Sequence, residues 1–389
     1  MKQNYYQNTI KVLTIFAILL FCSSSIYAQC NGNPTASAQG FTTFLLNDAT
    51  ITSNENEGTL ALGGNLTLDN IYTLALNSAN SYIVGTDTNP TALVVGGRIF
   101  YISGNGLNIV NGGFVKIGDL TGSNIYDTGN TRITPGGFDS FPRIELSTNQ
   151  SAASITENSG INFVQAFNDF QNISSGLASI SSNNSLVINT SNNTATINLI
   201  AGQTNYFTID ASVFMGLSQI TWSSAPNATT PVIFNFTGSG TITSDFPNIA
   251  GLSAADGRFV LYNYSNFTAI NLQGSRTVYG TLYAPFANVN KSAHVGNIEG
   301  QVIALSLDHD GGEIHNYEFS AMVNYACSNN CQAVITPYYN INSAGWNQGS
   351  TVNLECGDNV TFGPQPISRI SPSSPCGRGR RCGSGDRFR

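Results

Sequence analysis

Residues 278–284, VYGTLYA, recur twenty residues later as residues 298–304, IEGQVIA. A second pattern of strand, Gly-Gly and strand occurs in residues 60–68 (LALGGNLTL), 93–101 (LVVGGRIFY) and 109–117 (IVNGGFVKI), with the glycine pairs 33 and 16 residues apart. Repeats of this size are typical of a β-solenoid, in which each coil stacks its strands on the previous coil and buries a continuous apolar core. The sequence therefore predicts a mainly β, β-helix-like solenoid, with a Greek-key β-sandwich as the alternative.

One segment has the periodicity of a helix instead of a strand. Between residues 161 and 181, apolar side chains recur at offsets of 0, 4, 7, 14 and 17, namely Phe163, Phe167, Phe170, Leu177 and Ile180. These offsets fall on one face of a helix with 3.6 residues per turn. We expect one long helix that flanks the solenoid and packs this face against it.

The first 28 residues are typical of a secretory signal peptide. Lys2 and Lys11 precede the apolar run of residues 12–21 (VLTIFAILLF), and Ala28 is the small residue at the expected cleavage site. The run is shorter than the roughly 20 residues that cross a bilayer, and no later stretch is apolar enough to do so. A lipoprotein attached through Cys22 is a weaker alternative, because bulky Phe21 precedes the cysteine. We expect a secreted or cell-surface bacterial protein without a transmembrane segment after cleavage.

Composition predicts further divisions after the signal peptide. We expect the solenoid domain over residues 29–324, a polar linker over 325–332 and the opening strands of an immunoglobulin-like module over 333–368. Such a module needs roughly 100 residues, so this one is partial. The Arg-, Gly- and Ser-rich tail, residues 369–389, is interpreted as disordered or aberrant.

Charge excludes one class of partner. Residues 29–368 hold seven Lys and Arg against 21 Asp and Glu, so this span has a net charge of −14. A surface of this charge repels the phosphate backbone. We therefore exclude nucleic acid as a ligand.

The cysteines indicate disulfide bonds at the ends of the mature domain. None lies between Cys30 and Cys327, and Cys331 and Cys356 follow. In an oxidising compartment Cys327 and Cys331 could pair with each other, or with Cys30 and Cys356. The sequence leaves this connectivity open.

All three histidines, His294, His309 and His315, lie within 22 residues of one another. Asp308, His309, Asp310, Glu313 and His315 are weak candidate ligands for a divalent metal, and strand alternation would place Glu313 and His315 on one face. The alternative is that Asp-Gly-Gly forms a turn and that His315 satisfies a backbone carbonyl. The alternative weighs more, so no cofactor is expected.

The sequence gives no support for catalysis. A polysaccharide lyase or hydrolase needs paired carboxylates or a base with nearby cations, and the few basic residues of the body are widely scattered. No nucleophile elbow, phosphate loop or dinucleotide motif occurs. We expect no enzyme and name no catalytic residue.

Several segments together resemble the choice-of-anchor A family of bacterial surface adhesive domains. The resemblance covers about residues 36–322 and is carried by residues 93–97 (LVVGG), the helix at 163–180, 259–264 (FVLYNY), 280–287 (GTLYAPFA), 300–304 (GQVIA) and 311–316 (GGEIHN). It implies a secreted or surface-attached, adhesin-like domain. The immunoglobulin-like start resembles modules in secreted proteins of the Bacteroidetes.

The chain also resembles bacterial ice-binding proteins in plan, since those combine a β-solenoid with a long flanking helix. Ice binding would require a flat, regular array of Thr and small residues, and the Thr-rich stretches show no evident array. We therefore expect a non-catalytic domain that recognises a surface or a polysaccharide. A polysaccharide-degrading solenoid enzyme and an ice-binding protein are the alternatives.

Overall fold

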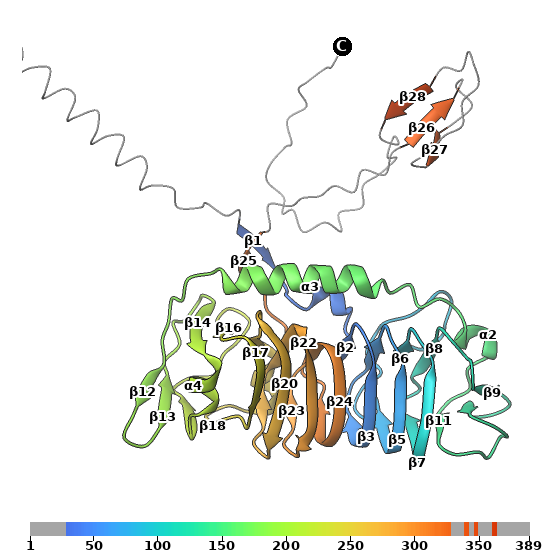
Figure 1. Ribbon diagram of the computed structural model, residues 1–389, viewed down its shortest axis with the longest axis horizontal. Helices are drawn as coiled ribbons and strands as arrows, with labels where there is room; N and C mark the ends of the chain where they lie inside the picture. The colour runs from blue at the N-terminus through green and yellow to red at the C-terminus, as the bar shows by residue number, and fades with distance from the viewer. Residues whose placement is uncertain (1–28, 328–337, 342–345, 349–359, 364–389) are drawn as a thin grey trace, which may run out of the picture. The chain divides into compact units, whose positions relative to one another are not determined.

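The computed structural model describes residues 29–327, 338–341, 346–348 and 360–363 (Figure 1). It divides into one unit of residues 31–327 and a second unit that contains residues 1–30 and 328–389. The first unit is a β-solenoid whose coils each have three sides. The prediction of a mainly β, solenoid-like fold is confirmed.

The first side of the solenoid is a parallel sheet covered by a helix. Its strands pair in the spatial order β14 (Asn205–Asp210), β16 (Val232–Thr237), β19 (Val260–Asn263), the start of β22 (Thr281–His294), the start of β24 (Val302–His315), β2 (Thr43–Leu45), β4 (Leu60–Leu62), β6 (Thr91–Val95) and β8 (Phe114–Ile117). These strands are short apolar runs that are buried almost throughout, as expected for a parallel sheet covered on both sides.

The second side, here called the Thr/Asn face, is also a parallel sheet. It consists of β17 (Gly240–Ser244), β20 (Phe267–Gly274), residues 288–294 of β22, residues 306–310 of β24, and the first parts of β3 (Ala49–Asn56), β5 (Leu66–Leu74) and β7 (Ile99–Ile109). These strands lie side by side in Figure 1, from β17 to β7. Alternate residues point into the core and outward.

The third side completes each coil. It contains β13 (Thr194–Ile197), β15 (Gln219–Trp222), β18 (Asn248–Ala250), β21 (Val278–Tyr279), β23 (Ile298–Glu299), the ends of β24, β3, β5 and β7, and β11 (Arg143–Leu146). The repeat of residues 278–284 in residues 298–304 is real structure, since Val278 pairs with Ile298 and Leu282 with Val302.

The glycine repeat is only partly equivalent. Gly63-Gly64 and Gly96-Gly97 stack at the same corner, where the Gly97 N–H donates to the Gly64 carbonyl at 2.7 Å. The third member at this corner is Gly118, whose N–H donates to the Val95 carbonyl at 2.8 Å. The Gly112-Gly113 pair precedes β8 instead. Residues 109–117 therefore share the sequence pattern of the other two segments without lying in register with them, because the β7–β8 connection is short and puts the glycine pair at another corner.

The chain does not stack its coils in sequence order. The first coil lies against the last, since Thr43 pairs with both Leu60 and Val302. The N-terminal half proceeds from β2 to β8 at one end of the solenoid, and the C-terminal half starts at β14 at the other end and returns to β24. We call the contact between the first and last coils the seam.

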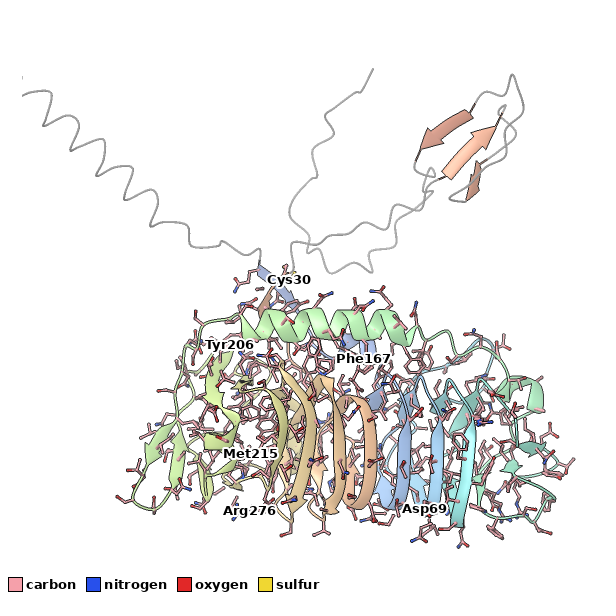
Figure 2. The ribbon with its side chains drawn as sticks, viewed as in Figure 1. Cys30, Asp69, Phe167, Tyr206, Met215 and Arg276 are labelled. Carbon is pink, nitrogen blue, oxygen red and sulfur yellow. The ribbon has the colours of Figure 1, made fainter. Side chains whose placement is uncertain are left out.

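Helix α3 (Phe163–Ala178) connects the two ends and lies along the first side (Figure 1). It begins where the Asn162 side chain accepts a hydrogen bond from the Gln165 N–H at 3.0 Å, an N-cap. Phe167, Phe170 and Leu177 are buried, and the Phe167 side chain lies between α3 and the strands in Figure 2. The helix lies inside the segment for which the sequence predicts it, although Ile180 falls beyond its end.

Aromatic rings fill the core of the C-terminal half. The Phe234 ring stacks between Phe207 and Tyr262, with centroid distances of 5.0 and 5.3 Å. These rings occupy equivalent positions on three successive strands. Each buried ring of this kind stabilises the fold by roughly 1.5–3 kcal/mol through the hydrophobic effect.

Smaller elements complete the described residues. They are β1 (Gln29–Gly32), which pairs with β25 (Val323–Ala326), the hairpin of β9 (Asn124–Tyr126) and β10 (Arg132–Thr134), β12 (Val187–Asn189), the short helices α2 (Ala152–Ile155) and α4 (Ala211–Met215), and the 3-10 turns η1 (Ala36–Ala38) and η2 (Ala254–Phe259). No helix in these parts of the chain is long and apolar enough to cross a membrane.

In the second unit, β26 (Tyr338–Ile341) pairs antiparallel with both β27 (Trp346–Gln348) and β28 (Val360–Gly363). This small sheet falls within residues 333–368, and the immunoglobulin-like identity of that segment stays a prediction. The predicted signal peptide, residues 1–28, and the tail of residues 369–389 lie outside the described residues.

Candidate binding surface

The Thr/Asn face presents one continuous row of outward side chains. The backbone register joins, in spatial order, Thr243, Asn271, Asn290, Asp308, Thr50, Thr67 and Phe100. The row arises from strand alternation, because the neighbouring residues Ile270, Val289 and Leu307 point into the core. Adjacent members lie on strands about 4.8 Å apart.

Hydrogen bonds between neighbouring coils fix many side chains of this face. Asn271 Nδ2 donates to Thr243 Oγ1 at 3.0 Å, and Ser306 Oγ donates to Asn288 Oδ1 at 2.8 Å. At the far edge, Ser103 Oγ donates to Asp69 Oδ1 at 2.6 Å, and Asp69 is labelled there in Figure 2. These paired side chains are therefore ordered and lose little side-chain entropy when the face binds a ligand.

The chemistry of this face is mixed. The row combines three threonine hydroxyls, two asparagine amides and one carboxylate, and it ends at Phe100, over whose ring the Arg98 guanidinium lies at 4.5 Å. Asp308 is the row's carboxylate and lies in its middle. The surface can therefore accept and donate hydrogen bonds over several coils.

His309, one of the five candidate metal ligands, is buried inside the solenoid. Its Nε2 donates to the Gly312 carbonyl at 3.1 Å, and its Nδ1 accepts from the Tyr72 hydroxyl at 2.7 Å. Burial lowers the pKa of the His309 imidazole to about 3. Both ring nitrogens are occupied, so His309 has no lone pair left for a metal.

His315 and Glu313 lie together on the third face, as strand alternation predicted. His315 Nδ1 faces Glu299 Oε2 at 2.6 Å, and its Nε2 faces Glu313 Oε2 at 2.8 Å. Because carboxylates only accept, both ring nitrogens carry protons. The Glu299 hydrogen bond, with that of Glu313, raises the pKa of His315 to about 9. The expectation that His315 satisfies a backbone carbonyl was wrong, since it forms an imidazolium between two carboxylates.

The remaining candidates point away from these histidines. Asp308 is exposed on the Thr/Asn face, and Asp310 Oδ1 accepts from Ser53 Oγ at 2.7 Å. A register shift between Asp310 and Glu313 turns the chain onto the third face. The five candidates therefore do not converge, and within residues 29–327 and the described strands beyond them no group of three or more His, Cys, Asp or Glu could hold a metal ion.

Lys291 is a buried group that the sequence did not single out, and it lies close to His294 and Gly311. Lys291 Nζ donates to the His294 carbonyl at 3.0 Å and to the Gly311 carbonyl. Burial lowers the pKa of Lys291 to about 7. Lys291 lies in a part of the strand rich in Asn and Ser, so its residue type predicts a surface position. The one sign of its burial in the sequence is its spacing, because it follows the inward-pointing Val289 by two residues.

Cys30 and Cys327 are both disulfide-bonded. Cys331 and Cys356 lie outside the described residues, and the predicted connectivities stay predictions.

The residues of the Thr/Asn face were missed by the sequence analysis. Their signal is weak but present, because each follows or precedes by one position an apolar residue that packs in or against the core. What the sequence could not supply was the order of the coils.

Several solved structures are similar to the chain at low identity. They include an ice-binding protein from an Antarctic biological consortium (9% identity, 75% of this chain and 92% of that chain, TM-score 0.28), one from the Antarctic ascomycete Antarctomyces psychrotrophicus (11%, 75% and 98%, 0.31) and an ice-binding domain from Shewanella frigidimarina (13%, 76% and 98%, 0.29). TM-scores this low carry no argument about this chain. No curated protein matches it in sequence.

A family model described as "Putative Ice-binding-like adhesive domain" matches residues 34–316. This range holds every coil of the solenoid, helix α3, the Thr/Asn face and the histidine cluster. The expectation of an adhesive domain is supported at this level. The chain belongs to the family of ice-binding-like adhesive domains.

Proposed function

We propose that the chain is a non-catalytic adhesive domain that binds an extended, hydroxyl-rich polymer through the Thr/Asn face. The observation that carries the proposal is the row from Thr243 to Phe100, which runs in unbroken register across seven strands. Each coil adds one side chain to a row of this kind, so many weak contacts add up along a polymer.

Polysaccharide is favoured over ice as the ligand. The row mixes Asn, Asp308, Thr and Phe100, whereas an ice lattice repeats one spacing and would favour one small side chain at every step. Amide and carboxylate groups match the paired hydroxyls of sugars, and buried contacts of this type contribute about 0.5–3 kcal/mol each. Ice stays the second candidate, favoured by the family description and by the adjacent pair Thr50 and Thr67.

A further part of the proposal concerns where the protein acts. We propose cleavage after Ala28, a solenoid domain of residues 29–324 and a following immunoglobulin-like module, in a protein that is secreted or attached to a bacterial surface, as in the choice-of-anchor A family. The disulfide-bonded Cys30 and Cys327 suit an oxidising compartment. N-terminal sequencing of protein exported by a bacterial host tests the cleavage, with Gln29 as the expected first residue.

A bulky substitution tests the face itself. Thr67→Tyr puts a large side chain in the row, between Thr50 and Phe100, and Thr73→Tyr puts the same side chain on the third face of the same strand, β5. We expect Thr67→Tyr to weaken retention on insoluble polysaccharides at least about tenfold, a loss of 1.4 kcal/mol. Thr73→Tyr should bind like the wild type.

The outcomes separate the candidates. Ice-crystal shaping that Thr67→Tyr abolishes, without retention on any polysaccharide, would replace polysaccharide by ice. If neither ligand is bound, or if both variants bind as well as the wild type, the Thr/Asn face is not the adhesive surface.

A further inference from the structure

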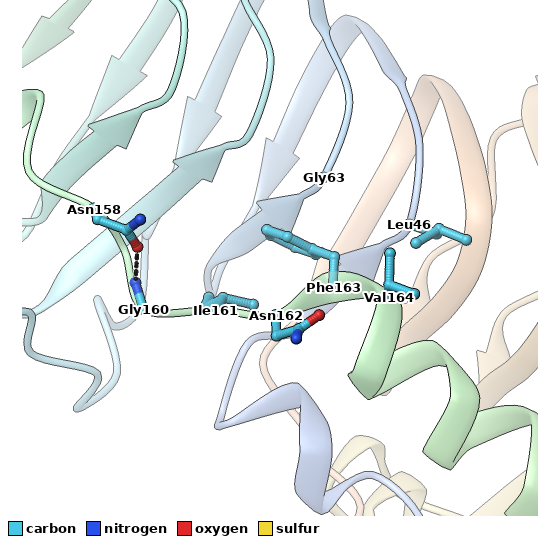
Figure 3. Close-up of a pocket in the computed structure, with 8 residues that line it drawn as sticks. All are labelled: Leu46, Gly63, Asn158, Gly160, Ile161, Asn162, Phe163 and Val164. Atoms are coloured by element: carbon cyan, nitrogen blue, oxygen red, sulfur yellow. Dashed lines mark hydrogen bonds between the residues drawn. The ribbon is translucent and has the colours of Figure 1, made fainter. Parts of the chain in front are cut away.

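Two adjacent depressions meet at the corner between the helix-covered side and the Thr/Asn face, and both are lined by Leu46 and Gly63. The strand depression, of about 600 Å³, includes Asp48, Thr50, Asn288 and Asp308. The helix-end depression, of about 500 Å³, includes Ile161, Phe163 and Val164 and is drawn in Figure 3. We call the two together the seam groove, because the strand depression takes residues from both the first and the last coil.

The groove is hollow because coil stacking demands glycine there. A Cβ on Gly63 would lie 2.4 Å from the Leu46 carbonyl oxygen, and one on Gly64 would lie 2.2 Å from Asp48 Oδ1. Real Cβ atoms do not approach so closely, so the stacked backbone excludes side chains at both positions. The bottom of the groove is therefore backbone without side chains, and it lies between a polar wall and an apolar wall.

The strand depression offers hydrogen-bonding groups that the fold leaves unused. Asp48 Oδ1 accepts from the Asn65 N–H at 2.6 Å, which fixes the carboxylate in place. The side chains of Thr50 and Asp308 have no hydrogen-bond partner among the residues that the structure describes. Their hydroxyl and carboxylate are therefore available to a ligand.

The helix-end depression supplies an apolar wall. The Phe163 ring packs on Phe44 at 5.1 Å and faces Gly63, and Val164 is 65% exposed. Leu46 lines both depressions, so the apolar wall and the polar wall share this residue, which Figure 3 draws with the apolar wall. An exposed apolar wall beside fixed polar groups is the usual composition of a small-ligand site.

We infer that the seam groove is a binding subsite for neutral hexopyranose units of a polysaccharide bound along the Thr/Asn face. A pyranose ring has an apolar C–H face, which fits against Phe163, and a rim of hydroxyls, which fits Thr50 and Asp308. No lysine or arginine lines either depression, so the groove lacks a counter-charge for uronic or sulfated sugars. The inference rests on the proposed function, since the groove opens onto the Thr/Asn face.

The test uses soluble oligosaccharides, which are too short to need the whole face. We would titrate the full mature chain with cellohexaose and maltohexaose, and with hexamers of galacturonic acid and of glucosamine as charged controls, by calorimetry. We expect one neutral hexamer to bind. Asp308→Asn and Phe163→Ala should each weaken it at least about fivefold, the effect of losing one hydrogen bond to a charged group or one ring contact.

Matched controls lie elsewhere in the solenoid. Phe138, 42% exposed, and Asp139, with an 86% exposed side chain, are at the β10–β11 connection, so Phe138→Ala and Asp139→Asn should leave the affinity unchanged. Thermal unfolding of each variant separates loss of binding from loss of fold.

The outcomes of these experiments test the subsite separately from the proposed function of the Thr/Asn face. Binding of a hexamer that requires Asp308 and Phe163, without retention on polymers, supports the subsite and overturns the extended face. Retention on polymers with equal hexamer affinity in wild type, Asp308→Asn and Phe163→Ala overturns the subsite alone. Binding of only a charged hexamer, or of no hexamer at millimolar concentration, also overturns it.

Discussion

His315 is a cation held between Glu299 and Glu313 on the third face, and its environment makes a pH-dependent contribution to stability. The pKa of His315 is about 9 in the fold, above the value of 6.5 for an ordinary histidine. Its contribution is therefore fully present below about pH 6.5 and is lost as the pH rises through 9. The two ion pairs of His315 hold the start and the end of the last coil together, because Glu313 and His315 are on β24 and Glu299 is on β23.

We predict that His315→Gln lowers the free energy of unfolding by about 1–3 kcal/mol at pH 6 and by much less at pH 10. Urea unfolding of both proteins across this range measures the difference. Lys291, whose pKa is lowered to about 7, changes stability in the opposite direction as the pH rises, and it is present in both proteins. A difference that does not vary with pH would contradict the ion-pair interpretation.

Asn263 is a fully buried amide that ties helix α3 to the first side of the solenoid. Its Nδ2 donates to the Ser174 carbonyl and to Asn235 Oδ1, both at 2.9 Å, and its Oδ1 accepts from Ser174 Oγ at 2.6 Å. Asn263→Leu would leave these partners buried without hydrogen bonds. We predict a loss of at least about 2 kcal/mol in chemical unfolding, whereas Asn168→Leu, on the exposed side of α3, should cost little.

At the scale of the elements, helix α3 touches the backbone of another element through a glycine. A Cβ on Gly176 would lie 2.2 Å from the Ala326 carbonyl oxygen, so the contact with β25 depends on the missing side chain. Glycine inside a helix costs up to about 1 kcal/mol relative to alanine. The close approach explains why the helix keeps it.

We predict that Gly176→Ala destabilises the domain by about 1–3 kcal/mol, although it improves helix propensity, because the backbone of α3 or β25 must shift. Ser175→Ala, at the neighbouring exposed position, should be neutral or slightly stabilising. Thermal unfolding of the three proteins measures this. A more stable Gly176→Ala protein would show that α3 and β25 are farther apart than described.

At the scale of the whole molecule, the seam joins segments that lie near the two ends of the domain's sequence. Thr43 pairs with Val302, and Asn316 Oδ1 accepts from Thr42 Oγ1 at 2.7 Å. These strands lie in the middle of the stack, with coils on both sides. The seam is therefore internal, although it is formed by the two ends of the domain's chain.

We predict that β2, β3 and β24 exchange their amide hydrogens most slowly, and that β9, β10, β12 and β13 at the ends of the stack exchange fastest. Opening the seam requires separation of both halves, whereas an end strand can open alone. Hydrogen–deuterium exchange followed by mass spectrometry measures this. Fast exchange at the seam would mean that the two halves are separate folding units.

Local structure could be read from the sequence. The 20-residue repeat identified two coils in correct register, and the Phe167 and Phe170 periodicity identified the buried side of α3. Alternation correctly put Glu313 beside His315. The reason is that all three signals depend on neighbours within a strand or within a few turns of a helix, so side-chain polarity alone encodes them.

The tertiary structure decided the rest. The sequence determined strands, their inward and outward residues and one amphipathic helix, but the same coils could stack in more than one order. Only the long return of the chain through α3 puts the first coil against the last, and so brings Thr50 beside Asp308, puts Asp48 in the seam groove and makes the row of the Thr/Asn face continuous. Pairing between parallel strands depends on shape and burial across the whole stack, which no local pattern of residues records.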